Sequence, residues 1–286
     1  MMGMTEIALG LMTALAWGFH DFFVWLVVKQ VNTFTVLIVT NSVGTLGLLL
    51  LIFYWKEGVF IGQDFLLISI IYGAAFLIGT VSLFMAFNSG PVFVAAPIIC
   101  SYLLLSLLYA TMYGGGPTSY QLLLSRLVIL GLSLTLTPQF SANLKFESNI
   151  VTTIFWSLVS ALFFSISFHL GQNQIVIGHE ISSNFFVRLA AIILLLSFSF
   201  RNTHFLKLRP IQIFILIIMG CADTFALTIT VYSGNLTNPV LSSVSASTFG
   251  LITILLVCIV YRERLSIIQS LGVTLVFFSI GTLSLI

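Results

Sequence analysis

Long apolar runs dominate the chain, and short polar segments separate them. Each run has about 20 residues, the length of an α-helix that crosses the roughly 30 Å hydrocarbon layer of a bilayer. A transmembrane β-barrel would show alternating segments of about 10 residues instead. Helices also satisfy their own backbone hydrogen bonds in lipid. The pattern therefore predicts ten helical spans, at residues 5–28, 34–54, 64–88, 91–112, 119–137, 150–172, 181–200, 210–233, 237–260 and 266–286.

Composition and charge indicate the same class of protein. Of the 286 residues, 59% are hydrophobic and only 6% are charged, whereas soluble domains carry about 25% charged residues. So few charges cannot cover the surface of a soluble protein of this length. A net charge of +2 without a basic run argues against a nucleic-acid partner. We therefore expect an all-α, multi-pass protein of the cell (plasma or inner) membrane, surrounded by the lipid bilayer.

Motifs for catalysis and for cofactor binding are absent from the sequence. It contains no Gly-x-Ser-x-Gly and no His-Glu-x-x-His, and the missing P-loop argues against an ATP-driven pump. The cysteines Cys100, Cys221 and Cys258 lie inside apolar runs and form no spaced Cys/His cluster. The sequence thus predicts neither an enzyme nor a metal or cofactor site.

An internal repeat emerges when the chain is shifted by 147 residues. The shift brings Gly73 onto Gly220 and Asn88 onto Asn235 without gaps. Each copy would hold five spans, and an odd number makes the second copy enter the membrane from the opposite side. Inverted repeats of this kind are typical of transporters, with the site near the midplane between the copies. We predict two five-helix repeats, residues 1–138 and 149–286, that form one integrated transport domain.

Three motifs give the chain a resemblance to a known family. They are Arg262-Glu263-Arg264-Leu265 followed by Gln269 and Gly272, Ala16-Trp17-Gly18 late in the first span, and Gly90-Pro91-Val92 before the fourth. With these motifs the chain resembles the EamA-type branch of the drug/metabolite transporter superfamily over nearly its whole length. The resemblance implies ten helices, a central cavity walled by spans one to four and six to nine, and peripheral spans five and ten. One departure is Gly114-Gly115-Gly116, which replaces the acidic turn in the first copy.

Basic residues gather on one side of the predicted topology. The other side, which holds both termini, has only Lys56. The positive-inside rule therefore predicts both termini outside, whereas many relatives in the family are thought to have them inside. The basic side carries Lys29, Lys145, Arg201, Lys207, Arg209, Arg262 and Arg264.

Ionisable residues inside spans are the first candidates for function, because each costs about 2.5–3.5 kcal/mol on insertion scales. Asp223 lies near the middle of the eighth span and shares a helical face with Gly220, Thr224 and Leu227. It is a candidate carboxylate that responds to protons or cations, or that contacts a substrate amine. The structural alternative is an ion pair, or a carboxylic acid hydrogen-bonded to a neighbouring helix.

The first span holds a second group of candidates. Trp17, His20 and Asp21 share one face by their three- and four-residue spacing. His20 can titrate near neutral pH, and Trp17 can stack on a substrate. The alternative for Trp17 is helix packing.

Two further candidate positions are linked by the repeat, and a third candidate is an aromatic residue. Arg188 in the seventh span falls on Asn41 in the second when shifted by 147. An arginine there can clamp a carboxylate or phosphate or neutralise Asp223; the alternative is snorkelling to the interface. Tyr102, in the middle of the fourth span, is the aromatic residue that we retain among the pocket candidates. The others are Tyr72, Phe84, Trp156, Tyr232 and Phe249.

These observations favour a secondary transporter that works by alternating access. One cavity with charges of both signs suits a small polar or amphipathic metabolite such as an amino acid, and protons are a candidate coupling ion. The expected partners are the small-molecule substrate, the lipid bilayer and protons, in a monomer or a homodimer. The alternative is a non-transporting scaffold or receptor. A polar cavity at the midplane would favour transport, and a solid apolar core would favour the scaffold.

Overall fold

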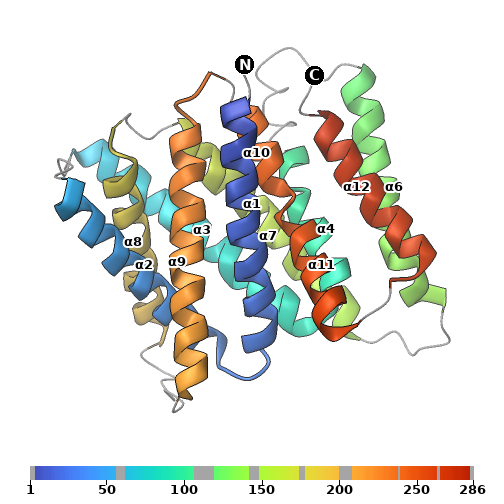
Figure 1. The fold of residues 1–286 in the computed structure, drawn as a ribbon, viewed down its shortest axis with the longest axis horizontal. Coiled ribbons are helices and arrows are strands. Elements are labelled where there is room, and N and C mark those ends of the chain that lie inside the picture. Colours follow the sequence, from blue (N-terminus) through green and yellow to red (C-terminus); the bar gives the residue numbers. More distant parts are fainter. Residues whose placement is uncertain are drawn as a thin grey trace.

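The computed structural model describes residues 4–55, 62–105, 119–141, 148–173, 178–199, 208–237, 239–262 and 265–283, all regular elements of which are α-helices. Residues 114–116 and 263–264 and the basic loop positions 56, 145, 201 and 207 lie outside this part. Figure 1 shows the helices, which are α1 (Met4–Val27), α2 (Thr33–Trp55), α3 (Gln63–Ser89), α4 (Val92–Cys100), α6 (Ser119–Ser141), α7 (Ser148–Asn173), α8 (Glu180–Ser199), α9 (Pro210–Ser233), α10 (Pro239–Ser247), α11 (Phe249–Tyr261) and α12 (Ile267–Leu283).

Seven helical segments are long and apolar enough to cross a membrane. They are α1, α2, α3, α7, α8, α9 and the stretch Ser242–Tyr261 that combines α10 and α11. Large apolar side chains such as Leu50, Phe53 and Ile259 are about 70% exposed on the outer surface. Such exposure is unfavourable in water but not in lipid. The prediction of a multi-pass helical membrane protein is confirmed. Three shorter apolar helices cover Val92–Leu105, Arg126–Thr135 and Ile267–Ser279.

The helices run up and down one bundle (Figure 1). We call the end that holds the start of α1 and the end of α12 the terminal end, and the other the opposite end. α1 packs against α9, α10 and α11, and α3 packs against α7 and α8. α2 lies against α8 and α9, while α4 contacts α7 and α11. α6 and α12 pair with each other at one margin of the bundle.

Glycines make several close helix contacts, and two of these glycines form a matched pair. A Cβ on Gly73 would lie 2.6 Å from the Val187 carbonyl oxygen, and one on Gly220 would lie 2.7 Å from the Thr40 carbonyl oxygen. Both the two glycines and their two partners are 147 positions apart. Membrane helices associate through such close backbone approach because lipid gives them no apolar surface to hide. The same helix contact is thus built twice.

Two helices are interrupted at equivalent positions. α4 stops before Ser101 (φ −70°, ψ 0°) and α10 stops before Thr248 (φ −71°, ψ −1°). The Ser101 hydroxyl donates to the Ile98 carbonyl at 2.6 Å, and the Thr248 hydroxyl donates to the Ser245 carbonyl at 2.7 Å. Hydroxyl groups that bond to the preceding turn in this way compete with the helix and bend it. The two interruptions are again 147 positions apart.

Candidate functional site

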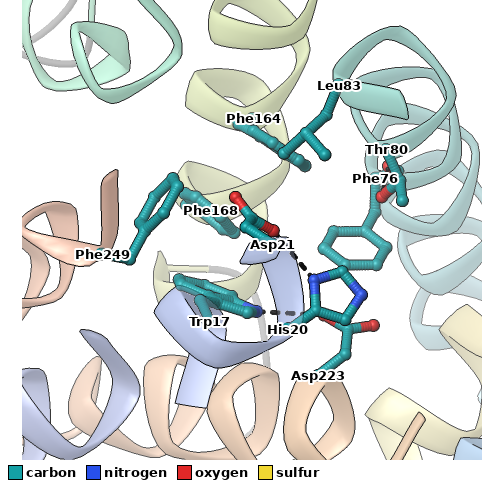
Figure 2. A pocket seen from close by; sticks show the side chains of 10 residues that line it. All are labelled: Trp17, His20, Asp21, Phe76, Thr80, Leu83, Phe164, Phe168, Asp223 and Phe249. Carbon is teal, nitrogen blue, oxygen red and sulfur yellow. Dashed lines mark hydrogen bonds and ion pairs between the residues drawn. The ribbon is translucent and has the colours of Figure 1, made fainter. Parts of the chain in front are cut away.

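A small pocket lies inside the bundle, between α1, α3, α7, α9 and α11 (Figure 2). Every lining residue is buried. Its free volume, measured for the centre of a water molecule, is about 20 Å³, which is room for roughly one water. The lining residues are Trp17, His20, Asp21, Phe76, Thr80, Leu83, Phe164, Phe168, Asp223 and Phe249.

Polar groups on α1 and α9 form one side of this pocket. His20 Nδ1 lies 2.9 Å from Asp21 Oδ1, within α1. Trp17 Nε1 donates to Asp223 Oδ1 at 3.0 Å and so joins α1 to α9. Asp223 Oδ2 accepts from Arg188 Nη2 at 2.9 Å, which extends the chain of contacts to α8. The structure therefore brings four of these candidates from the sequence, and the aromatic candidate Phe249, into the pocket lining. It links Asp223 to a further candidate, Arg188.

One carboxylate oxygen of Asp21 takes no part in these contacts. Its Oδ2 is buried and has no hydrogen-bond partner among the described residues. The carboxylate projects from α1 toward the rings carried by α7 (Figure 2). A buried acceptor without a partner costs about 1–3 kcal/mol, and more when it is charged. The position therefore calls for a donor that the described residues do not supply.

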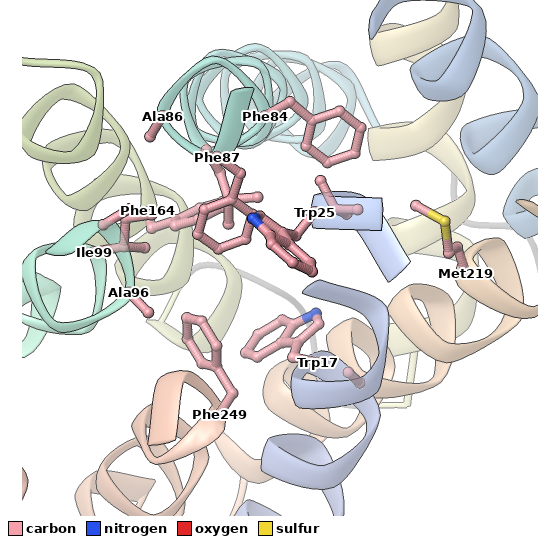
Figure 3. Close-up of a cluster of buried hydrophobic side chains, with 14 of the residues drawn as sticks. Trp17, Trp25, Phe84, Ala86, Phe87, Ala96, Ile99, Phe164, Met219 and Phe249 are labelled. Atoms are coloured by element: carbon pink, nitrogen blue, oxygen red, sulfur yellow. The ribbon is translucent and has the colours of Figure 1, made fainter. Parts of the chain in front are cut away.

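Aromatic rings form the other side of the pocket. Trp17 stacks on Phe168 with ring centroids 5.1 Å apart, and Phe164 stacks on Phe168 at 5.4 Å. Phe249 meets Trp17 edge-on at 5.8 Å, and Phe76 lies 5.9 Å from Phe164. These rings continue into the buried core, where Figure 3 shows Trp17, Phe164 and Phe249 among its apolar side chains. The pocket thus has one charged side and one aromatic side.

Arg188 and Asn41 lie outside the pocket. The Arg188 side chain is fully buried and donates from Nη1 to Asn41 Oδ1 at 3.4 Å, in addition to its ion pair with Asp223. Gly44 leaves space for it, because a Cβ there would lie 3.0 Å from Arg188 Nε and 2.2 Å from Thr224 Oγ1. Arg188 is therefore occupied by Asp223 and does not face the cavity.

Tyr102 also lies outside the pocket lining. Its ring packs on Phe168 at 5.1 Å, and its hydroxyl donates to the Ser243 carbonyl at 3.2 Å. It supports the aromatic side from behind and joins the helical turn after α4 to α10. It follows the interruption at Ser101 directly, as the pocket residue Phe249 follows the one at Thr248.

The sequence reasoning missed the aromatic residues on α3 and α7. A signal for them existed in the 147-residue shift, which places Trp17 on Phe164 and Asp21 on Phe168. The same shift places Phe76 on Asp223. Each of these three pairs has both members in the pocket lining. Thr80 and Leu83, one and two turns beyond Phe76 on α3, complete the lining.

Polar side chains tie the helices together at the terminal end. Gln172 on α7 donates to Ser243 Oγ at 2.8 Å and to Ser233 Oγ at 3.3 Å, which links α7 to α10 and α9. Asn235 after α9 donates to Glu180 at the start of α8. The positions equivalent to Gln172 and Asn235 at the opposite end are Trp25 and Asn88, which line a surface pocket of about 490 Å³. Hydrogen bonds between helices therefore close the terminal end, whereas the opposite end carries a surface pocket.

Comparison with known proteins identifies the fold and nothing narrower. No family model and no curated protein matches the chain. A solved structure described only as "Crystal structure of protein" is similar, with a TM-score of 0.70 at 13% identity over 97% of this chain and 95% of that chain. The two chains share a fold. That description names no activity, so function has to be argued from the site.

Proposed function

We propose that the chain is a secondary transporter of the drug/metabolite transporter type, with ten spans in two inverted five-helix repeats. It would move a small amphipathic metabolite across the cell membrane by alternating access, with the pocket between α1 and α7 as its binding site. The observation that carries this proposal is the set of contacts that recurs at a separation of 147 residues. The proposal adds the shorter apolar helices to the seven longer segments as spans.

The contact between Arg188 and Asn41 supports a two-fold relation between the copies. These residues are 147 positions apart and touch each other. Two equivalent positions in related copies can meet only close to the axis that relates them. Asp223 binds the same arginine and lines the pocket, so the pocket lies beside this axis. Substrate sites of inverted-repeat transporters are expected at the repeat interface.

The interruptions at Ser101 and Thr248 support a binding site at the same level. Interrupted helices at corresponding positions of the two halves are the best pointer to a transporter site. Phe249 begins α11 directly after the second interruption and lines the pocket. Tyr102 follows the first and packs on the pocket residue Phe168.

The small volume of the pocket is the one observation that favours the scaffold alternative. A scaffold with a solid core would be expected to satisfy its buried polar groups. Asp21 Oδ2 is instead left without a partner among the described residues, and Asp21 is one of the residues that line the pocket. The terminal end is closed by hydrogen bonds, and the opposite end carries a surface pocket. These features fit a state in which the site is closed and holds about one water.

Side-specific labelling tests the proposal without knowledge of the substrate. Thr80→Cys places a thiol in the pocket of a variant whose native cysteines are replaced. In proteoliposomes, we expect membrane-impermeant thiol reagents to reach it from either side. A short cross-link between Gln172→Cys and Ser243→Cys should then abolish labelling from the terminal end and leave labelling from the opposite end. Absence of labelling from both sides, as in a solid core, would refute alternating access.

A further inference from the structure

The geometry of the pocket also points to the class of its ligand. We propose that it binds an organic monocation, a primary ammonium ion attached to an apolar body, in preference to a zwitterion or an anion. The inference rests on the proposed function for its biological use, while the binding itself can be measured separately. It departs from the expectation of an amino acid, and the reason lies in where Arg188 points.

The ionisable side chains of the pocket lining are mostly acidic. Among the described lining residues, Asp21 and Asp223 are acidic and His20 is the single basic side chain. Asp223 is neutralised by Arg188, and that arginine is turned away from the cavity. His20 Nδ1 is engaged by Asp21 Oδ1. The carboxylate of a zwitterion would therefore approach two acids without meeting the arginine.

The free acceptor is the second argument. Asp21 Oδ2 needs a donor, and among the fully buried polar atoms of the described lining residues it is the one without a hydrogen-bond partner. A primary ammonium carries three N–H donors on a compact head. A cavity that holds about one water has room for such a head. A charge-assisted bond to a carboxylate is roughly twice as strong as a neutral hydrogen bond.

The aromatic side supplies the third argument. The faces of Trp17, Phe164 and Phe168 carry negative charge density and therefore attract cations and repel anions. Trp17 and Phe168 are stacked across the boundary between α1 and α7. A ligand body would part these two rings and replace their contact with its own. The ammonium would then lie at Asp21 and the apolar body among the rings.

A series of four ligands with one phenyl body tests the proposal. Phenethylamine is the cation, phenylalanine the zwitterion, 3-phenylpropionate the anion and 2-phenylethanol the neutral analogue. Binding to the purified full-length protein is measured by calorimetry in lipid nanodiscs. We expect phenethylamine to bind about tenfold or more tightly than phenylalanine, because the carboxylate of phenylalanine would be buried beside two acids without a donor, and an unsatisfied buried charge weakens binding by about tenfold or more. Phenylpropionate should bind most weakly.

Substitutions assign the effect to the site. Asp21→Asn should weaken phenethylamine about tenfold or more and leave 2-phenylethanol unchanged. Glu6→Gln is the matched control, because Glu6 is a buried acid on the same helix, about 22 Å away along its axis. Phe168→Leu keeps the apolar volume but removes the ring, so it should weaken the amine more than the alcohol. This second variant keeps the test decisive if Asp21→Asn does not fold.

The results separate this inference from the proposed function. Phenylalanine binding as tightly as phenethylamine, or equal effects of Asp21→Asn and Glu6→Gln, would overturn the cation assignment. If Thr80→Cys were still labelled from both sides, the transporter proposal would stand. Selective amine binding without any such labelling would instead uphold the cation site and refute transport.

Discussion

The buried ion pair between Arg188 and Asp223 allows the sharpest energetic prediction. The arginine is fully buried, and Asp223 is 6% exposed. Arg188→Met leaves Asp223 with Trp17 as its remaining donor among these contacts, and Asp223→Asn leaves the guanidinium with Asn41 at 3.4 Å. Removing one partner of a buried pair costs about 3–5 kcal/mol, because the other charge stays buried without compensation.

The double variant Arg188→Met/Asp223→Asn should recover most of this loss. Replacing a whole buried pair by neutral groups of similar volume is often close to neutral, so we expect it to cost about 1–2 kcal/mol. The two single losses together reach about 6 kcal/mol or more. The coupling energy of the pair is then about 4 kcal/mol or more, far above the roughly 0.5 kcal/mol within which independent sites add.

The free energy of unfolding can be measured by SDS titration in mixed micelles, followed by near-UV circular dichroism. Arg126→Met is the matched control, because Arg126 is exposed on α6 and surface changes are usually within about 0.5 kcal/mol. Single losses that simply add up in the double variant would show that the pair is not the unit that the structure describes.

Three further predictions concern stability and gating. Gly73→Ala and Gly220→Ala should each cost about 1–3 kcal/mol of unfolding free energy, since the added methyl meets a backbone carbonyl. Gly47→Ala, with open space around it, is the control in the same SDS titration. Equal losses in all three variants would contradict the close helix contacts. Gln172→Leu should speed labelling of the pocket cysteine from the terminal end, and an unchanged rate would show that this tie is no gate. Trp17→Phe keeps a ring but removes the donor to Asp223, so a loss of about 1.5–3 kcal/mol is expected in that titration, and no loss would contradict the bond.

The helices follow from the sequence more readily than their interruptions. Apolar runs bounded by polar turns predict a multi-pass helical protein because a bilayer leaves few alternatives. The interruptions at Ser101 and Thr248 depend on one hydroxyl bonding to the preceding turn. Serine and threonine occur throughout these helices, and most donate to the same helix without interrupting it, as Thr80 and Thr230 do. The sequence alone therefore does not mark the two that interrupt it.

The charged side of the pocket was predictable for a similar reason, and the rings that α3 and α7 contribute to its aromatic side were not. Acidic groups inside a membrane are costly, so Asp21 and Asp223 are conspicuous in an apolar sequence. Phenylalanine is not conspicuous among 27 copies in the chain, and only the repeat relation selects Phe164 and Phe168. Tyr102 illustrates the remaining gap: being central in a span does not say which helix face meets the cavity.

The proposed repeat allows one last test, because its two copies would share backbone positions but differ in chemistry. Asp21 and Phe168 are 147 positions apart, and both line the pocket. If a two-fold axis passes beside this pocket, a carboxylate at position 168 should reach the same ligand head from the other side. Asp21→Phe should abolish selective phenethylamine binding, and Asp21→Phe/Phe168→Asp, which conserves total volume, should restore part of it. A double variant that binds no better than Asp21→Phe, although it folds equally well by circular dichroism, would show that the two positions are not equivalent toward the ligand.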